Sequence, residues 1–198
     1  MKLLTAFKNT KSSGFTLIEL LVVIGILGIL AAALVATIDP FEQLKKADDS
    51  KIKNLAVEFQ TANVRYYTTH SKFPWNNVDN ATANATCYAA AADVVSLALS
   101  AARPLACINN PSTGSLIAEG ELKSGFALNL NDLGKVFLNW EGTTDPTNMI
   151  VCFAPQSKSQ ISSPETIYSV AGADISGTTC APTATVEARR NNCYWCTR

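Results

Sequence analysis

An apolar run near the N-terminus dominates the hydrophobic pattern of this chain. Residues 15–38 are apolar except for Thr16, Glu19 and Thr37. At about 1.5 Å per residue, a helix of about 24 residues extends roughly 36 Å, which exceeds the roughly 30 Å hydrocarbon core of a bilayer. The pattern therefore predicts a membrane-spanning helix. Its one charged side chain, Glu19, requires a cationic partner, because a carboxylate is costly to bury in lipid.

Small residues recur within this run. Gly25, Gly28, Ala31 and Ala32 follow one another at close to one helical turn. Small side chains let helix backbones approach closely, which favours association where lipid removes the hydrophobic drive. Glycine is also common in membrane helices in general. The pattern is therefore consistent with a packing surface between subunits or with ordinary membrane-helix composition.

A helix boundary is predicted directly after the apolar run. Asp39, Pro40 and Glu42 form an N-terminal helix signal, with an acidic cap, proline at the first helical position and glutamate at the capping-box position. Proline also removes a backbone donor and restricts the residue before it. We therefore expect a helix break at Asp39 and Pro40.

Apolar residues then recur at steps of three to five and predict an amphipathic helix over residues 40–69. The expected packing face consists of Phe41, Leu44, Ala47, Ile52, Leu55, Phe59, Ala62 and Tyr66. The expected solvent face consists of Lys45, Lys46, Asp49, Lys51, Lys53 and Glu58. We expect the packing face to cover the chain's own sheet, with His70 as a C-terminal cap.

The remainder of the chain has a mixed α+β pattern. β-type runs predict strands of an antiparallel sheet at residues 126–130, 135–140, 149–154 and 165–170. The first two runs are joined by residues 131–134, which are expected to form a hairpin turn.

Two segments precede these predicted strands. Residues 89–102 are alanine-rich, stop before Pro104 and predict a short helix. Residues 76–88 are rich in Asn and Thr and predict a loop, in which the glycosylation sequons at Asn80 and Asn84 are a sign of exposure.

Charge and cysteine content indicate where the two ends of the chain lie. The net charge is zero, so the composition does not indicate a strong positive potential that would attract nucleic acid. All charged side chains before the apolar run are basic, so the N-terminus is expected to be cytoplasmic. All six cysteines follow the predicted span, as expected for disulfides formed outside the cytoplasm. They are Cys87, Cys107, Cys152, Cys180, Cys193 and Cys196. We expect Cys87 to pair with Cys107 and leave the other two pairs open.

The string Gly14-Phe15-Thr16-Leu17-Ile18-Glu19-Leu20-Leu21 resembles the processing site of the type IV pilin and pseudopilin superfamily. The resemblance is close over residues 8–40 and looser over residues 41–75. It implies cleavage between Gly14 and Phe15, N-methylation of Phe15, and pairing of Glu19 with the N-terminal amine of a neighbouring subunit. A secretory signal peptide cut near Ala33 is the alternative, but its apolar region would contain Glu19 and continue past the alanines.

The resemblance also implies the organisation of the whole chain. Residues 1–14 are expected to be a leader, 15–38 the membrane-spanning and assembly half of the N-terminal helix, and 39–72 its amphipathic half. Residues 73–198 are expected to form an extracytoplasmic α+β domain, in which a small antiparallel sheet packs on the helix and disulfides stabilise the fold. The implied partners are further copies of the chain, a prepilin peptidase and N-methyltransferase, an inner-membrane assembly platform and the lipid bilayer.

The sequence contains little that predicts catalysis or cofactor binding. The single histidine gives no basis for a catalytic triad, and no phosphate-binding glycine loop is present, so we expect a protein that is not an enzyme and has no cofactor. Calcium is a minor alternative, with Glu141, Asp145 and Asp174 as candidate ligands that lack a tight spacing. Cys193 and Cys196 have the C-x-x-C spacing of redox or zinc motifs, but structural disulfides are favoured.

Three functions compete at this stage. The first is a structural subunit of a surface type IV pilus, and the second is a pseudopilin of a type II secretion system. The third is a monomeric membrane-anchored binding or redox protein. Surface ligands, including DNA, are a further possibility, for which the candidate contacts are Arg189, Arg190, Tyr194, Trp195 and Arg198.

Overall fold

The computed structural model describes residues 14–37, 39–88, 94–110, 114–140 and 148–197. The chain separates into two compact units, with the boundary between Pro40 and Phe41. The first unit contains helix α1 (Leu17–Thr37), and helix α2 (Pro40–His70) belongs almost entirely to the second. The predicted helix break is therefore present, since α1 ends at Thr37 and α2 begins at Pro40.

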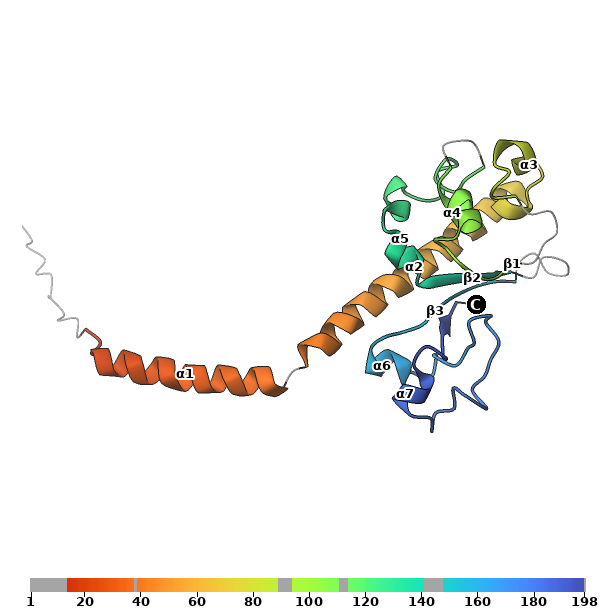
Figure 1. Cartoon of the computed structure of the whole chain (residues 1–198). Coiled ribbons are helices and arrows are strands. Elements are labelled where there is room, and N and C mark those ends of the chain that lie inside the picture. Colours follow the sequence, from red (N-terminus) through yellow and green to blue (C-terminus); the bar gives the residue numbers. More distant parts are fainter. Residues whose placement is uncertain (1–13, 38, 89–93, 111–113, 141–147, 198) are drawn as a thin grey trace, which may run out of the picture. The chain divides into compact units, whose positions relative to one another are not determined.

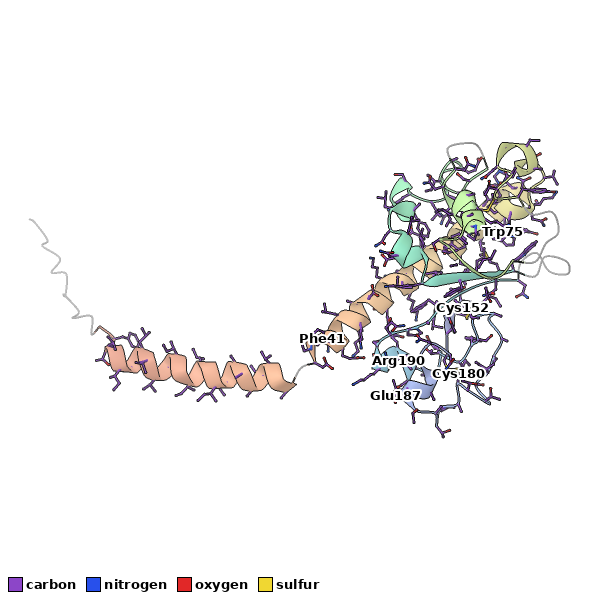
Figure 2. All side chains as sticks on the ribbon, in the orientation of Figure 1. Phe41, Trp75, Cys152, Cys180, Glu187 and Arg190 are labelled. Carbon is purple, nitrogen blue, oxygen red and sulfur yellow. A yellow bond between two sulfur atoms is a disulfide. The ribbon has the colours of Figure 1, made fainter. Side chains whose placement is uncertain are left out.

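Helix α1 exposes its apolar side chains along its whole length (Figure 2). Its sequence is apolar on every side, and helices of this kind are stable when lipid or other helices surround them. α1 is long and apolar enough to cross a membrane, with Leu17–Val35 as the candidate span.

Helix α2 supplies one wall of the core of the second unit (Figure 1). The buried residues of α2 are Asp49, Ile52, Ala56, Phe59, Ala62, Asn63 and Tyr66. The predicted packing face is therefore correct from Ile52 onward but wrong at its start, because Phe41 and Leu44 are 73% and 67% exposed. The assignment of Asp49 to the solvent face is also wrong, because this carboxylate is buried and binds backbone and side-chain donors of Gln156 and Ser157.

The second unit contains a four-stranded antiparallel sheet in the order β1-β2-β3-β4. Its strands are β1 (Val94–Ala98), β2 (Val136–Trp140), β3 (Met149–Phe153) and β4 (Trp195–Cys196). In both β2 and β3, every residue except the second is buried, because both strands contribute to the core shared with α2. This confirms the predicted α+β class and the strands predicted at residues 135–140 and 149–154.

Short helices precede the first strand or connect the strands. They are η1 (Pro74–Asn76), α3 (Asn80–Ala83), α4 (Ala102–Ile108), η2 (Ser124–Leu128), α5 (Leu130–Leu133), α6 (Lys158–Ile161) and α7 (Val186–Arg189). The predicted loop over residues 76–88 therefore contains a helical turn, α3, in addition to irregular segments.

The strand predicted at residues 126–130 is wrong, and so is its hairpin with the next strand. The segment forms η2 and α5, because the Asn129 side chain accepts a hydrogen bond from Asp132 N and caps α5. Phe126 packs over Phe59 of α2, with ring centroids 6.3 Å apart. The apolar residues of this segment therefore serve contacts with the helix and not an alternating strand face.

The helix predicted over residues 89–102 is also wrong in its described part. Residues 94–98 form β1, whose irregular pairing with β2 is fixed where Ser96 N donates to Asn139 Oδ1 at 2.7 Å. The helix begins only at Ala102, and Pro104 lies in its first turn, where a missing amide hydrogen costs nothing. The strand predicted at residues 165–170 reduces to isolated bridges from Tyr168 to Asp174 and Tyr194.

Three disulfides link the second unit. Cys87 is bonded to Cys107, the pair that the sequence favoured. Cys152 is bonded to Cys196 across strands β3 and β4, and Cys180 is bonded to Cys193. The Cys152–Cys196 bond ties the end of the chain to the sheet, and the Cys180–Cys193 bond closes a loop within the C-terminal segment, in which regular structure is sparse (Figure 2).

The asparagines of both sequons are buried, so the predicted exposure of this segment is wrong at these positions. Asn80 donates to the carbonyl oxygens of Pro74 and Gly114, at 2.7 and 3.1 Å. Asn84 donates to Ala106 O at 2.9 Å and accepts from Asn110 Nδ2 at 2.8 Å. In the folded chain these amides connect loops and have no free nitrogen for a glycan.

Gly114→Ala is expected to destabilise the second unit by about 2–3 kcal/mol, because Gly114 has φ +88° and an added Cβ would lie 1.8 Å from Asn80 Oδ1. The matched control is Gly120→Ala, which has φ +77° but open space around the Cβ position. We expect the control to lose only about 1 kcal/mol. Urea unfolding of the detergent-solubilised chain measures both, and equal losses would contradict the steric role of Asn80.

Candidate functional site

The N-terminal end of α1 is closed by a reciprocal capping box. Thr16 N and Thr16 Oγ1 each donate to Glu19 Oε2, both at 2.8 Å, and Glu19 N donates to Thr16 Oγ1 at 3.3 Å. These bonds satisfy amide groups that the first turn of a helix leaves unpaired. The spacing Thr-x-x-Glu is a known signal for this arrangement, whereas the hydropathy pattern alone shows Thr16 only as a polar interruption.

The predicted cleavage position lies immediately before this capping box. Gly14 and Phe15 precede α1 in an exposed segment without regular structure, and the Phe15 side chain is 89% exposed. The bond between them is therefore accessible to a peptidase. Among the described residues Glu19 forms no ion pair, so its charge is balanced only by the Thr16 donors.

The small residues of α1 leave open space on the helix surface. A Cβ placed on Gly25 or Gly28 would meet no atom within 4 Å, apart from the helix's own neighbouring backbone. Ala31 and Ala32 are exposed as well. At roughly 100° per residue these four positions fall within about a third of the helix circumference. The surface is thus available for another helix.

The prokaryotic N-terminal methylation motif matches residues 9–35 of the chain, a range that includes the predicted cleavage site, the capping box and most of α1. In this segment the chain is therefore similar to proteins that carry the prokaryotic N-terminal methylation motif. The prepilin motif inferred from Gly14, Phe15 and Glu19 is confirmed as a motif by this match.

Relatives among known proteins support the same family. The chain is 38% identical over 78 residues to a fimbrial protein of Neisseria meningitidis serogroup A, covering 39% of this chain and 45% of that protein. It is 42% identical over 69 residues to a type IV major pilin protein PilE1 of Neisseria gonorrhoeae, covering 35% of this chain and 41% of that protein. The chain thus matches less than half of the length of these relatives. No solved structure matches the chain.

The cysteines of the C-x-x-C sequence have separate partners. Cys193 is bonded to Cys180 and Cys196 is bonded to Cys152, so Cys193 and Cys196 are not bonded to each other. No free cysteine occurs in the described chain, which argues against the redox and zinc interpretations of the motif.

The candidate calcium ligands are only partly described. Glu141 and Asp145 lie outside the described residues. Asp174 Oδ1 accepts a hydrogen bond from Ser176 N at 2.9 Å, which is a local turn contact. Within the described residues no group of three His, Cys, Asp or Glu side chains is placed to hold a metal ion.

The candidate nucleic-acid residues near the C-terminus do not share one exposed surface. Arg189 is buried, and its guanidinium donates to the carbonyl oxygens of Ser163 and Thr166 at 3.0 and 2.7 Å. Tyr194 is partly buried against Phe137, and burial raises the pKa of its hydroxyl. Arg198 lies outside the described residues. Arg189 and Tyr194 thus have structural contacts that leave them poorly placed for stacking on bases.

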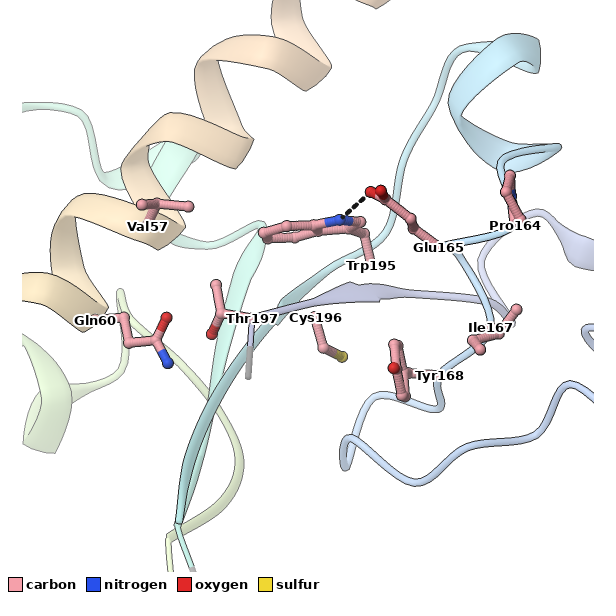
Figure 3. Close-up of a pocket in the computed structure, with 9 residues that line it drawn as sticks. All are labelled: Val57, Gln60, Pro164, Glu165, Ile167, Tyr168, Trp195, Cys196 and Thr197. Atoms are coloured by element: carbon pink, nitrogen blue, oxygen red, sulfur yellow. Dashed lines mark hydrogen bonds between the residues drawn. The ribbon is translucent and has the colours of Figure 1, made fainter. Parts of the chain in front are cut away.

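A pocket of about 510 Å³ lies between α2 and the C-terminal segment (Figure 3). Trp195 crosses it, donating from its indole Nε1 to Glu165 Oε2 at 3.1 Å. Lys53 Nζ lies 4.4 Å from the centre of the Trp195 ring and 3.4 Å from Glu165 Oε2. The Trp195 hydrogen bond and the Lys53 charge lower the pKa of Glu165. Because the Lys53 ammonium group occupies the face of the Trp195 ring, we interpret this cluster as a structural contact that holds strand β4 in place.

Glu165 is expected to make folding slightly pH-dependent under acid conditions. Since its pKa is lowered in the folded state, its stabilising effect is present above the unfolded pKa of about 4.3 and is lost as the pH falls through the folded pKa. The effect should stay under about 1 kcal/mol because the side chain is 65% exposed. Glu165→Gln should reduce the loss of stability between about pH 5 and pH 3, and an unchanged pH profile in urea unfolding would contradict this role.

Proposed function

We propose that this chain is a structural subunit of a type IV pilus. The observation that carries the proposal is the prepilin-type motif, which combines an accessible Gly14–Phe15 bond with Glu19 at the start of an exposed apolar helix. The matched relatives are named as fimbrial and major pilin proteins, which supports a structural and non-enzymatic role. No cofactor is part of the proposal.

Before assembly, α1 anchors the chain in the cytoplasmic membrane. Its length and apolarity suit this task, and Lys2, Lys8 and Lys11 before it favour a cytoplasmic N-terminus. A prepilin peptidase then cuts after Gly14, which creates a new amine at Phe15 that is subsequently methylated. The disulfide-bonded second unit lies on the opposite side of the membrane, in an oxidising compartment.

Assembly brings the Phe15 amine of one subunit to the Glu19 carboxylate of another, on an inner-membrane assembly platform. Glu19 Oε2 accepts hydrogen bonds from Thr16 within the chain, which orients the carboxylate, while no cation among the described residues pairs with its charge. Leaving such a charge unpaired in an apolar environment typically costs about 3–5 kcal/mol. The pairing therefore selects the correct register between stacked subunits, with Gly25 and Gly28 permitting close helix contacts.

Mass spectrometry of cells divided into a sheared surface fraction and a membrane fraction tests this function. A peptide that begins with methylated Phe15 in the sheared fraction is expected. The same peptide confined to membranes would indicate a pseudopilin of a type II secretion system. An intact leader, or a cut near Ala33, would contradict the proposed maturation.

A further inference from the structure

A second pocket, of about 310 Å³, lies beside α2 and is lined by residues of α2, β2, β3 and the segment before β4. Its most buried lining is apolar, because Ile52 and Phe153 are 2% and 1% exposed. Phe137 and Tyr194 also line it, are only partly buried and stand edge to face, with ring centroids 5.9 Å apart. Ligand pockets typically measure about 300–1,000 Å³, so this one has room for a small ligand with an apolar group.

An ion pair lines the solvent side of the same pocket. Asp48 Oδ2 accepts from Lys135 Nζ at 2.6 Å, and the two side chains are 40% and 44% exposed. A carboxylate can accept, and an ammonium group can donate, more than one hydrogen bond. Within the described chain, Asp48 Oδ1 accepts no hydrogen bond, and the other acid near Lys135, Asp132 at 3.9 Å, pairs with Lys51. Both members of the pair can therefore bind a ligand without separating.

The remaining charged lining residue, Asp49, is already engaged. Its Oδ1 accepts from Gln156 N, and its Oδ2 accepts from Ser157 N and Ser157 Oγ. Arg190 Nη1 donates to the carbonyl oxygen of Gln156 at 3.5 Å and so adds a second cation beside the second acid. The charges at the pocket are thus two negative and two positive. A ligand with one net charge would disturb this balance, whereas a zwitterion preserves it.

We propose that this pocket binds an α-amino acid with an apolar side chain, such as phenylalanine or leucine. The ligand's ammonium group donates to Asp48, its carboxylate accepts from Lys135, and its side chain lies against Phe137 and Tyr194. Hydrogen bonds between charged groups fix the orientation, and the apolar lining favours a ligand larger than glycine. This binding activity goes beyond the proposed structural role and does not depend on it.

The test measures binding of three ligands with the same aromatic body to the full-length chain in lipid nanodiscs. Phenylalanine carries both charged groups, phenethylamine lacks the carboxylate and 3-phenylpropanoate lacks the amine. Saturation-transfer NMR, with empty nanodiscs as background, is expected to show saturable binding of phenylalanine and at least tenfold weaker binding of the other two, because each leaves one charge of the ion pair without a ligand partner. Absence of phenylalanine binding, or equal binding of either analogue, would overturn the inference.

Two variants locate the binding in the pocket. Asp48→Asn and Lys135→Gln are each expected to weaken phenylalanine binding at least fivefold. The matched control is Glu165→Gln, which alters an exposed ion pair with Lys53 outside this pocket and should leave the affinity unchanged. Equal affinities of Asp48→Asn and the control would overturn the inference.

Folding and assembly are separated from binding in the same experiment. Retention of all three disulfides, shown by alkylation and mass spectrometry, is expected in every variant, since both members of the Asp48–Lys135 pair are partly exposed. The measurement uses the unassembled chain. Failure to bind phenylalanine therefore leaves the proposed pilus function standing, and failure to form filaments leaves the binding result standing.

Discussion

Glu19→Ala is expected to leave cleavage after Gly14 intact and to reduce the yield of sheared filaments at least tenfold. The variant removes the one charge of α1 and both hydrogen bonds that Thr16 donates to it. In the proposed assembly, loss of the carboxylate would leave the Phe15 amine of the neighbouring subunit unpaired in an apolar environment, at a typical cost of about 3–5 kcal/mol. The measurement compares mature chain in membranes with mature chain in the sheared fraction.

Glu19→Gln distinguishes the charge from the cap. A glutamine at this position retains an oxygen that can accept from Thr16 N, as in other capping boxes, but has no negative charge. We expect Glu19→Gln to fail in assembly nearly as strongly as Glu19→Ala. If instead the glutamine variant forms filaments at the parent yield, helix capping and not charge pairing is the role of Glu19.

Asp49→Ala is expected to destabilise the second unit by about 3 kcal/mol. The Asp49 carboxylate is buried and accepts from Gln156 N at 2.9 Å, Ser157 N at 2.8 Å and Ser157 Oγ at 2.6 Å. These bonds tie the segment before α6 to α2. Removing the acceptor leaves buried donors unpaired, each at a cost of about 1–3 kcal/mol. Urea unfolding in detergent, followed by tryptophan fluorescence, measures the change.

The preceding residue supplies the control for this prediction. Asp48 pairs with Lys135 at 2.6 Å, but both side chains are about 40% exposed. Exposed ion pairs typically contribute only about 0–1 kcal/mol. Asp48→Ala should therefore change the free energy of unfolding by less than about 1 kcal/mol, and similar losses for the two variants would show that burial does not decide the strength of the Asp49 contacts.

The N-terminal segment could be predicted from sequence because its information is local. Residues 15–38 require only hydropathy and length to identify a span, and Gly14, Phe15 and Glu19 occur in a fixed order. The break before α2 was likewise predicted by Pro40, whose ring restricts only its own backbone and that of its neighbour. In each case the deciding interactions lie within a few residues of one another.

The errors in the second unit arise where distant residues decide the structure. Asp49 follows the polar spacing of a solvent face, but its donors lie more than 100 residues away at Gln156 and Ser157. Residues 94–98 are apolar enough for either a helix or a strand, and pairing with β2 decides between them. The composition of residues 76–88 likewise did not predict that Asn80 is buried, because one of its hydrogen-bond partners, Gly114, lies 34 residues away.

The same limit applies to the candidate site. Thr16 could have been recognised from the Thr-x-x-Glu spacing, since a capping box is a local signal. The pocket lined by Asp48 and Lys135 had no such signal, because these two residues are 87 positions apart and meet only in the folded unit. Packing of distant elements thus determines which charged side chains come together beside its aromatic lining.

In the proposed fibre, the Cys152–Cys196 bond would have a mechanical consequence for each subunit. Strand β4 has only two residues and would resist a pulling force poorly through its ladder hydrogen bonds alone. The covalent bond to β3 encloses the chain between these two cysteines in a closed loop. When a fibre is stretched, load that reaches the C-terminal end therefore passes directly into the central sheet, and the enclosed segment cannot be drawn out beyond the length of its loop.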